Sequence, residues 1–181
     1  DLVRSRGLGD VYKRQNQDSD NVMTGPGEIY AKEISGAGNA FALAIYEHSK
    51  LPLKVFEAAR MATAMINGCM ICMNWQSKRD VHQMGITKGV IENGEAPNQD
   101  FYSNLLSENY VHLSKKELLA VKFAKAMGED PKGLSNDEKF WVEVKDVFSD
   151  AEITDLTYCI AGWMGMGRVA HVLGLDQNCE I

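Results

Sequence analysis

The chain has little cysteine, little proline and no excess of basic residues, and each shortage excludes a class of protein. Four cysteines in 181 residues are too few for a secreted scaffold held by disulfides, so we expect a reducing, cytoplasmic location. The net charge of -6 and the absence of a basic stripe exclude nucleic acid as a partner. No apolar run reaches the roughly 18 residues of a membrane span and no signal peptide is evident, so we expect no membrane partner.

The beginning of the chain differs from the rest. Residues 10–15 resemble the translated end of a transposon adapter used in sequencing libraries, so we interpret residues 1–15 as an artefact outside the fold. Residues 16–27 are polar and rich in turn-forming residues, which predicts a flexible arm. Residues 28–181 contain no internal repeat and no domain boundary, so we expect one helical domain there.

Apolar residues recur at helical spacing and nothing alternates with period two for long, which predicts an all-α, single-domain helical bundle. The expected helices cover residues 28–35, 39–49, 53–67, 69–84, 87–92, 101–106, 115–127, 136–147 and 150–173. Gly36 and Gly38 are predicted to break the first helix from the second. Capping boxes that start at Ser114, Ser135 and Ser149 are predicted to open the last three helices.

The last helix contains three glycines, at positions 162, 165 and 167. A glycine inside a helix costs roughly 1 kcal/mol relative to alanine, so a compensating interaction is expected. Close packing of this helix on another one would compensate, either within the subunit or across an oligomer interface, and the sequence leaves both open.

The most informative motif is the pair Cys69-x-x-Cys72, which follows Asn67-Gly68 between two expected helices. The Asn-Gly step is suited to closing one helix and capping the next, which places both cysteines in the first turn of the second helix. Unpaired N–H groups and the helix dipole at that position favour a thiolate. Residues three apart on a helix are neighbours, so the two sulfurs could form a disulfide. The motif therefore predicts a redox-active dithiol at a helix N-terminus.

Glu57 is the acidic residue closest to this motif once the two helices fold back on each other. A carboxylate within about one turn of Cys72 could accept its proton directly, through water or through an intervening side chain. Alternatively, Glu57 forms a salt bridge on the helix surface with Arg60 or Arg79. Both interpretations stay open from the residues alone.

The arrangement Glu57-x11-Cys69-x2-Cys72, preceded by Asn-Gly in a helical hairpin, resembles the alkylhydroperoxidase D-like / carboxymuconolactone decarboxylase family. The match is best over residues 53–85. The resemblance implies an all-helical fold assembled as a dimer, trimer or hexamer. For the peroxidase members of the family it also implies reduction of hydroperoxides by the two cysteines.

The resemblance implies a role for each residue of the motif. Cys72 would attack the hydroperoxide, Cys69, the more exposed thiol, would resolve the product to a disulfide, and Glu57 would relay the proton. The family's histidine, four residues after the second cysteine, falls on Gln76. Glutamine can orient a water but cannot titrate near neutral pH, so we expect Glu57 to act through water with Gln76 as a positioning residue.

Three further residues are candidates for supporting roles. Arg79 could add positive charge that favours the thiolate, and Trp75 could line an apolar substrate pocket together with Trp163. His82 could replace the missing histidine, but it lies nearly three turns beyond Cys72 on the expected helix, so we expect it at the surface or at an interface.

The sequence thus predicts a thiol-dependent peroxidase that reduces organic hydroperoxides or H2O2 through a Cys69–Cys72 disulfide. A dithiol or thioredoxin-like partner would recycle it. We expect no metal and no bound cofactor, because the remaining cysteines, Cys159 and Cys179, do not complete a zinc site. Two alternatives stay open: a lactone decarboxylase that uses Glu57 as acid or base, and a non-enzymatic, oligomeric redox sensor.

Overall fold

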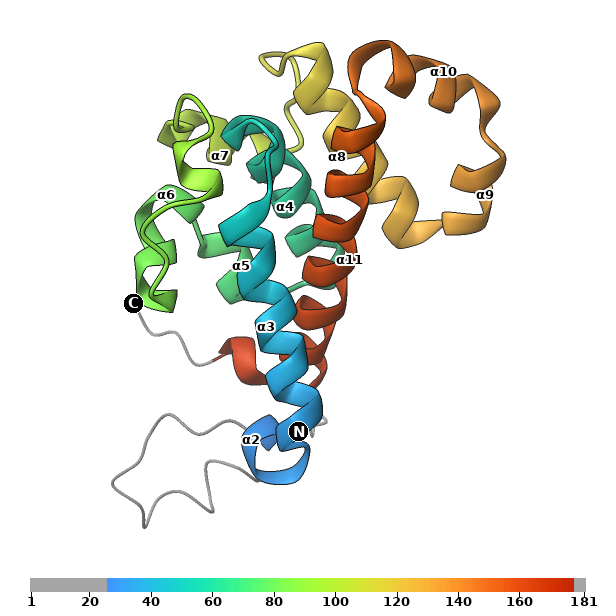
Figure 1. Cartoon of the computed structure of the whole chain (residues 1–181). Helices are drawn as coiled ribbons and strands as arrows, with labels where there is room; N and C mark the ends of the chain where they lie inside the picture. Colours follow the sequence, from blue (N-terminus) through green and yellow to red (C-terminus); the bar gives the residue numbers. More distant parts are fainter. Residues whose placement is uncertain (1–25, 178–181) are drawn as a thin grey trace, which may run out of the picture.

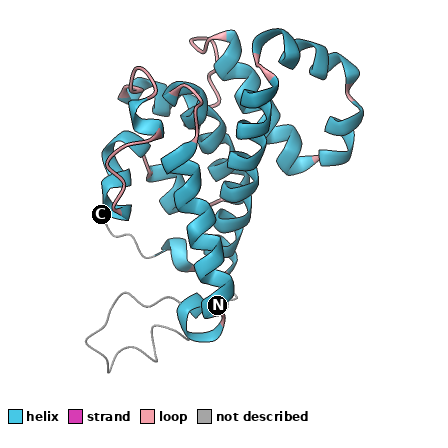
Figure 2. Cartoon of the chain, viewed as in Figure 1, coloured by secondary structure: helices cyan, strands magenta, loops and turns pink. Residues whose placement is uncertain are grey.

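The computed structural model describes residues 26–177 (Figure 1). All of its regular elements are helices, and these residues contain no strand, which confirms the all-α prediction (Figure 2). The α-helices are α2 (Pro26–Tyr30), α3 (Lys32–His48), α4 (Leu53–Asn67), α5 (Met70–Asn74), α6 (Ser77–Asp80), α7 (Gln99–Leu106), α8 (Lys115–Glu129), α9 (Pro131–Asn136), α10 (Glu138–Val147) and α11 (Asp150–Val172). The 3-10 helices are η1 (Val81–Met84), η2 (Val90–Glu92) and η3 (Leu175–Gln177).

The interpretation of residues 1–25 as artefact and arm lies outside the described residues. Pro26 and Gly27, which we assigned to the arm, are instead the first two residues of α2. Within the described part of the chain, no helix is both long and apolar enough to cross a membrane.

Helix α4 forms the centre of the fold. It is buried along almost its entire length, and Phe56 and Met61 are fully buried. Its neighbours are α8 and α11, while α3 runs alongside α11 (Figure 1). Alanines make up much of the α4 surface and allow these neighbours to approach closely. Removing a Phe or Met side chain from water stabilises the fold by about 1.5–3 kcal/mol, so this central helix is the rigid support for the cysteine turn that follows it.

Helix α3 continues through the two glycines at which we predicted a break, so that prediction is wrong. The cause lies in the tertiary structure. A Cβ built on Gly38 would lie 3.0 Å from the sulfur of Met166 on α11, so the missing side chain allows the two helices to pack closely. Packing against α11 outweighs the low helix propensity of glycine.

The capping boxes at Ser114 and Ser149 are confirmed at the starts of α8 and α11. The prediction that a capping box at Ser135 opens a helix is wrong. Asp130 caps the short helix α9 and Asp137 caps α10, so Ser135 lies inside α9 rather than before a helix. In Figure 1, α9 and α10 project from the side of the bundle next to α8 and α11.

Two of the three glycines in α11 are explained by close packing within the chain. A Cβ on Gly162 would lie 2.3 Å from Cδ1 of Ile45 on α3, and one on Gly167 would lie 2.4 Å from Nδ2 of Asn67 on α4. Gly165 has no atom within 4 Å of that position. A side chain at position 162 or 167 would therefore force a neighbouring side chain to shift, whereas at position 165 glycine only lowers helix propensity.

We predict opposite effects for two substitutions in α11. Gly167→Ala displaces the Asn67 amide, which donates to the Trp163 carbonyl at 3.1 Å, and should lower the free energy of unfolding by about 1–3 kcal/mol. Gly165→Ala should raise it by up to about 1 kcal/mol, because alanine favours the helix and meets no neighbour. Urea unfolding measures both, and equal effects of the two substitutions would contradict this account.

Candidate functional site

The turn between α4 and α5 has the geometry that the Asn-Gly step predicts. Gly68 has φ +65° and ends α4 in the left-handed conformation, which a residue with a Cβ adopts only with strain. The buried Asn67 side chain ties this turn to α11 through the Trp163 carbonyl. The cysteine motif therefore begins from a fixed position.

Cys69 and Cys72 form a disulfide, with their Cα atoms 5.2 Å apart. Cys69 is the N-cap of α5, and its sulfur accepts the N–H of Cys72 at 3.3 Å. Cys69 is fully buried, whereas Cys72 is partly exposed. The resemblance implied the opposite order of exposure. A substrate entering from solvent can reach Cys72 first.

An apolar pocket of about 210 Å³ adjoins Cys72. Its lining includes Ala64, Ile71, Cys72, Trp75, Trp163 and Met166. The ring of Tyr46, which also lines the pocket, meets Trp75 edge to face, with ring centroids 6.3 Å apart. Both tryptophans thus line one cavity, which is mainly apolar, and the partly exposed Cys72 borders it.

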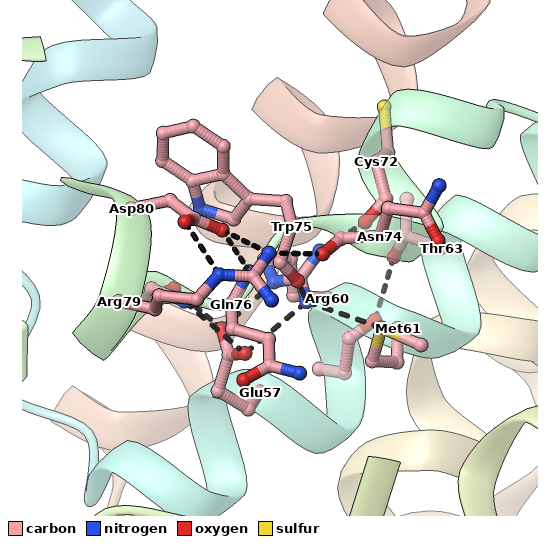
Figure 3. Close-up of polar contacts among 12 residues, drawn as sticks. Glu57, Arg60, Met61, Thr63, Cys72, Asn74, Trp75, Gln76, Arg79 and Asp80 are labelled. Atoms are coloured by element: carbon pink, nitrogen blue, oxygen red, sulfur yellow. Dashed lines mark hydrogen bonds and ion pairs between the residues drawn. The ribbon is translucent and has the colours of Figure 1, made fainter. Parts of the chain in front are cut away.

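A buried ion pair lies beneath this pocket. Glu57 is completely buried and Arg60 is 3% exposed, and Nε of Arg60 lies 2.7 Å from Oε1 of Glu57 (Figure 3). The Ser77 hydroxyl donates to the same carboxylate. Burial opposes the charge of Arg60, but the ion pair with Glu57 outweighs it and raises the pKa of the guanidinium. Burial, together with the nearby Glu57 carboxylate, raises the pKa of the Tyr102 phenol.

The guanidinium of Arg60 also closes the end of α5. Its two terminal nitrogens donate to the Cys72 and Trp75 carbonyls, each at 2.6 Å. Carbonyls in the last turn of a helix have no partner within the helix, and Arg60 supplies one. We predicted one continuous helix over residues 69–84, and that prediction is wrong. Helix α5 ends at Asn74, and two further short helices, α6 and η1, follow it.

The structure does not place Glu57 in hydrogen-bond contact with the sulfur of Cys72. Its carboxylate instead accepts hydrogen bonds from Arg60 and Ser77, and the Tyr102 phenol is a further partner. In Figure 3 the sulfur of Cys72 points away from this cluster. The alternative pairing of Glu57 with Arg60 is therefore the arrangement found, although it is buried and not on a helix surface.

The other predicted site residues lie outside the pocket lining. Gln76 is the N-cap of α6, and its side chain donates to Gln99 at 3.0 Å. Arg79 pairs with Asp80 at 2.6 Å. Partial burial opposes the charge of Asp80, but the hydrogen bonds from Arg79 prevail and lower its pKa. His82 is exposed on η1, as expected.

Cys159 is the free cysteine of the described chain and is 2% exposed. Burial and the neighbouring Asp155 raise the pKa of its thiol, which keeps it protonated and unreactive. Cys179 lies outside the described residues.

Sequence reasoning treated Arg60 only as a possible partner of Glu57 and missed its contacts with the cysteine helix. The spacing of three residues between Glu57 and Arg60 signalled the ion pair, but nothing local signalled the two carbonyls. Comparison with family models, curated proteins and solved structures found no match to this chain. What the geometry provides is a disulfide-forming cysteine pair beside an apolar pocket.

Proposed function

We propose that the protein is a thiol-dependent peroxidase of the alkylhydroperoxidase D-like type, which reduces organic hydroperoxides through Cys69 and Cys72. One observation carries this proposal: the partly exposed sulfur of a disulfide-forming pair borders an apolar pocket of about 210 Å³. The pocket suits the hydrocarbon part of an organic hydroperoxide, and the sulfur at its edge is the group that would meet the peroxide oxygen.

The reaction follows from the order of exposure. The Cys72 thiolate attacks the terminal oxygen of the hydroperoxide, the O–O bond breaks and an alcohol leaves after taking up a proton, which leaves a sulfenic acid on Cys72. The Cys69 thiol then attacks that sulfur, the S–O bond breaks, and water leaves with the proton of Cys69. An external dithiol reduces the disulfide and is itself oxidised, so two electrons from the dithiol convert one hydroperoxide to alcohol and water.

The ion pair supports this function by holding the reactive helix. Arg60 fixes the carbonyls of Cys72 and Trp75, and thereby the sulfur and one wall of the pocket. Glu57 is buried and already bonded to Arg60 and Ser77, so it offers a lactone substrate no free acid or base. The lactone alternative therefore has no observation in its favour.

A peroxide titration tests the proposal. One equivalent of tert-butyl hydroperoxide should consume two thiols of the reduced protein within seconds and link Cys69 to Cys72, as peptide mass spectrometry can show. The Cys159→Ala variant is the matched control and should react at the same rate, because that thiol is buried. Because the pocket is apolar, tert-butyl hydroperoxide should react faster than H2O2. Thiols that stay reduced for minutes would refute the peroxidase, whereas ready oxidation with slow turnover would favour the redox sensor.

A further inference from the structure

A second ionisable pair, His171 and Asp176, lies on the side of Cys69 that the peroxidase mechanism above does not use. Nδ1 of His171, near the end of α11, is 2.9 Å from Oδ2 of Asp176 in η3. The same oxygen accepts the backbone N–H of Met70, the first residue of α5, at 3.2 Å. The Asp176 side chain is 1% exposed and that of His171 is 46% exposed. The C-terminal segment thus places a buried carboxylate and a solvent-accessible imidazole beside the cysteine turn.

Both chain neighbours of Cys69 contact this pair. Met70 donates to Asp176, and a Cβ built on Gly68 would lie 3.4 Å from Cε1 and 3.5 Å from Nε2 of His171. Cys69 itself, between these two neighbours, is fully buried. The imidazole edge that carries Nε2 therefore faces the turn that holds Cys69.

The carboxylate determines how the imidazole can act. A carboxylate beside Nδ1 favours the proton on that nitrogen, so Nε2 is left to accept or donate a second proton toward the turn. The other oxygen of Asp176, Oδ1, is buried and has no hydrogen-bond partner among the described residues. Burying an unpartnered carboxylate oxygen costs free energy, so packing alone does not account for an acid at this position.

We propose that His171 exchanges the proton of the Cys69 thiol and that Asp176 is the residue that positions it. This deepens the proposed function and rests on the same pair of cysteines. When an external dithiol attacks Cys72, the S–S bond breaks, a mixed disulfide forms on Cys72, and Cys69 leaves as a thiolate. His171 in its protonated form supplies the proton that makes this thiolate a thiol. In the peroxide half-reaction, neutral His171 accepts the proton of Cys69 as its sulfur attacks the sulfenic acid of Cys72, the S–O bond breaks, and His171 passes that proton to the hydroxide, which leaves as water.

The pH dependence follows from the groups around the imidazole. Asp176 faces it from η3, and the ring lies against the cysteine turn at Gly68, where a built Cβ would be 3.5 Å from Nε2. Arg168, about one turn earlier on α11, donates to the Gly128 carbonyl instead. The protonated imidazole is the donor, so its contribution to reduction is present at low pH and is lost as rising pH removes that proton.

Reduction of the disulfide by dithiothreitol tests this proposal without any peroxide. The rate constant, divided by the fraction of dithiothreitol present as thiolate, is measured from pH 5.5 to 8.5 for the full chain. It should fall with rising pH in the unaltered protein. In His171→Gln it should be about tenfold lower at the acidic end and independent of pH. We expect less than the full range of general acid catalysis, because a thiolate also leaves without a proton.

The controls separate this proposal from others. His48→Gln, at an exposed histidine, should leave the profile unchanged. Asp176→Asn removes the carboxylate that positions the imidazole, so the rate should rise less toward the acidic end, and this variant carries the test if circular dichroism shows that His171→Gln does not fold. A His171→Gln profile identical to that of the unaltered protein, or an unchanged Asp176→Asn profile, would overturn the proposal. Failure of the peroxidase function would instead appear only in the peroxide titration.

Discussion

Replacing Cys72 by serine is expected to abolish peroxide reduction completely. Cys72 is the cysteine that adjoins the pocket, and Cys69 is fully buried behind it, so no other thiol of the pair can meet a hydroperoxide. A serine hydroxyl has nearly the same size but is not a thiolate and cannot form a sulfenic acid. Consumption of tert-butyl hydroperoxide, followed in the presence of excess dithiol, measures the loss.

The Cys69→Ser variant distinguishes the roles of the two sulfurs. It retains Cys72, so it should react once with the hydroperoxide and then stop with a sulfenic acid that dimedone traps on Cys72. Cys159→Ala should turn over normally and shows that loss of a thiol alone is without effect. The opposite pattern, with a trapped sulfenic acid on Cys69 in Cys72→Ser, would show that exposure in this structure does not set the order of attack.

Local signals in the sequence predicted the parts of the fold that depend on neighbouring residues. The Asn67-Gly68 step ends α4 because glycine adopts the left-handed conformation that the turn requires. The boxes at Ser114 and Ser149 open helices because their partners are three residues away. Such interactions are complete within one turn of chain, so the sequence can indicate them, although the same pattern at Ser135 lies inside α9 and opens no helix.

The site depends on interactions between distant residues, and these the sequence did not show. The helix break after Asn74 arises where Arg60, on another helix, takes the carbonyls of Cys72 and Trp75. The burial of Cys69 likewise depends on tertiary packing, and its neighbour Met70 is held by Asp176, far along the chain. Neither the contacts of Arg60 nor that of Asp176 can be predicted from hydrophobic periodicity or from the spacing of residues. The sequence predicted that the two cysteines could form a disulfide, but it did not predict which of the two is more exposed to solvent.

The second large effect concerns stability, and it is expected for Arg60→Met. This substitution leaves the Glu57 carboxylate fully buried without its positive partner and leaves two helix-end carbonyls without a donor. Removing one member of a buried ion pair costs about 3–5 kcal/mol, so the free energy of unfolding in urea should fall by that amount. Lys115→Met breaks an ion pair whose side chains are 61% and 69% exposed, and as the matched control it should cost far less than Arg60→Met.

A double variant shows whether the cost comes from the stranded charge. In Glu57→Gln/Arg60→Met neither charge is buried, so the loss should be clearly smaller than the sum of the two single losses. The remaining loss then reports the contacts of Arg60 with the Cys72 and Trp75 carbonyls, which the double variant also lacks. If Arg60→Met cost no more than Lys115→Met, the ion pair would not anchor the cysteine helix. The position of the Cys72 sulfur would then be fixed only by the turn between α4 and α5 and by the disulfide.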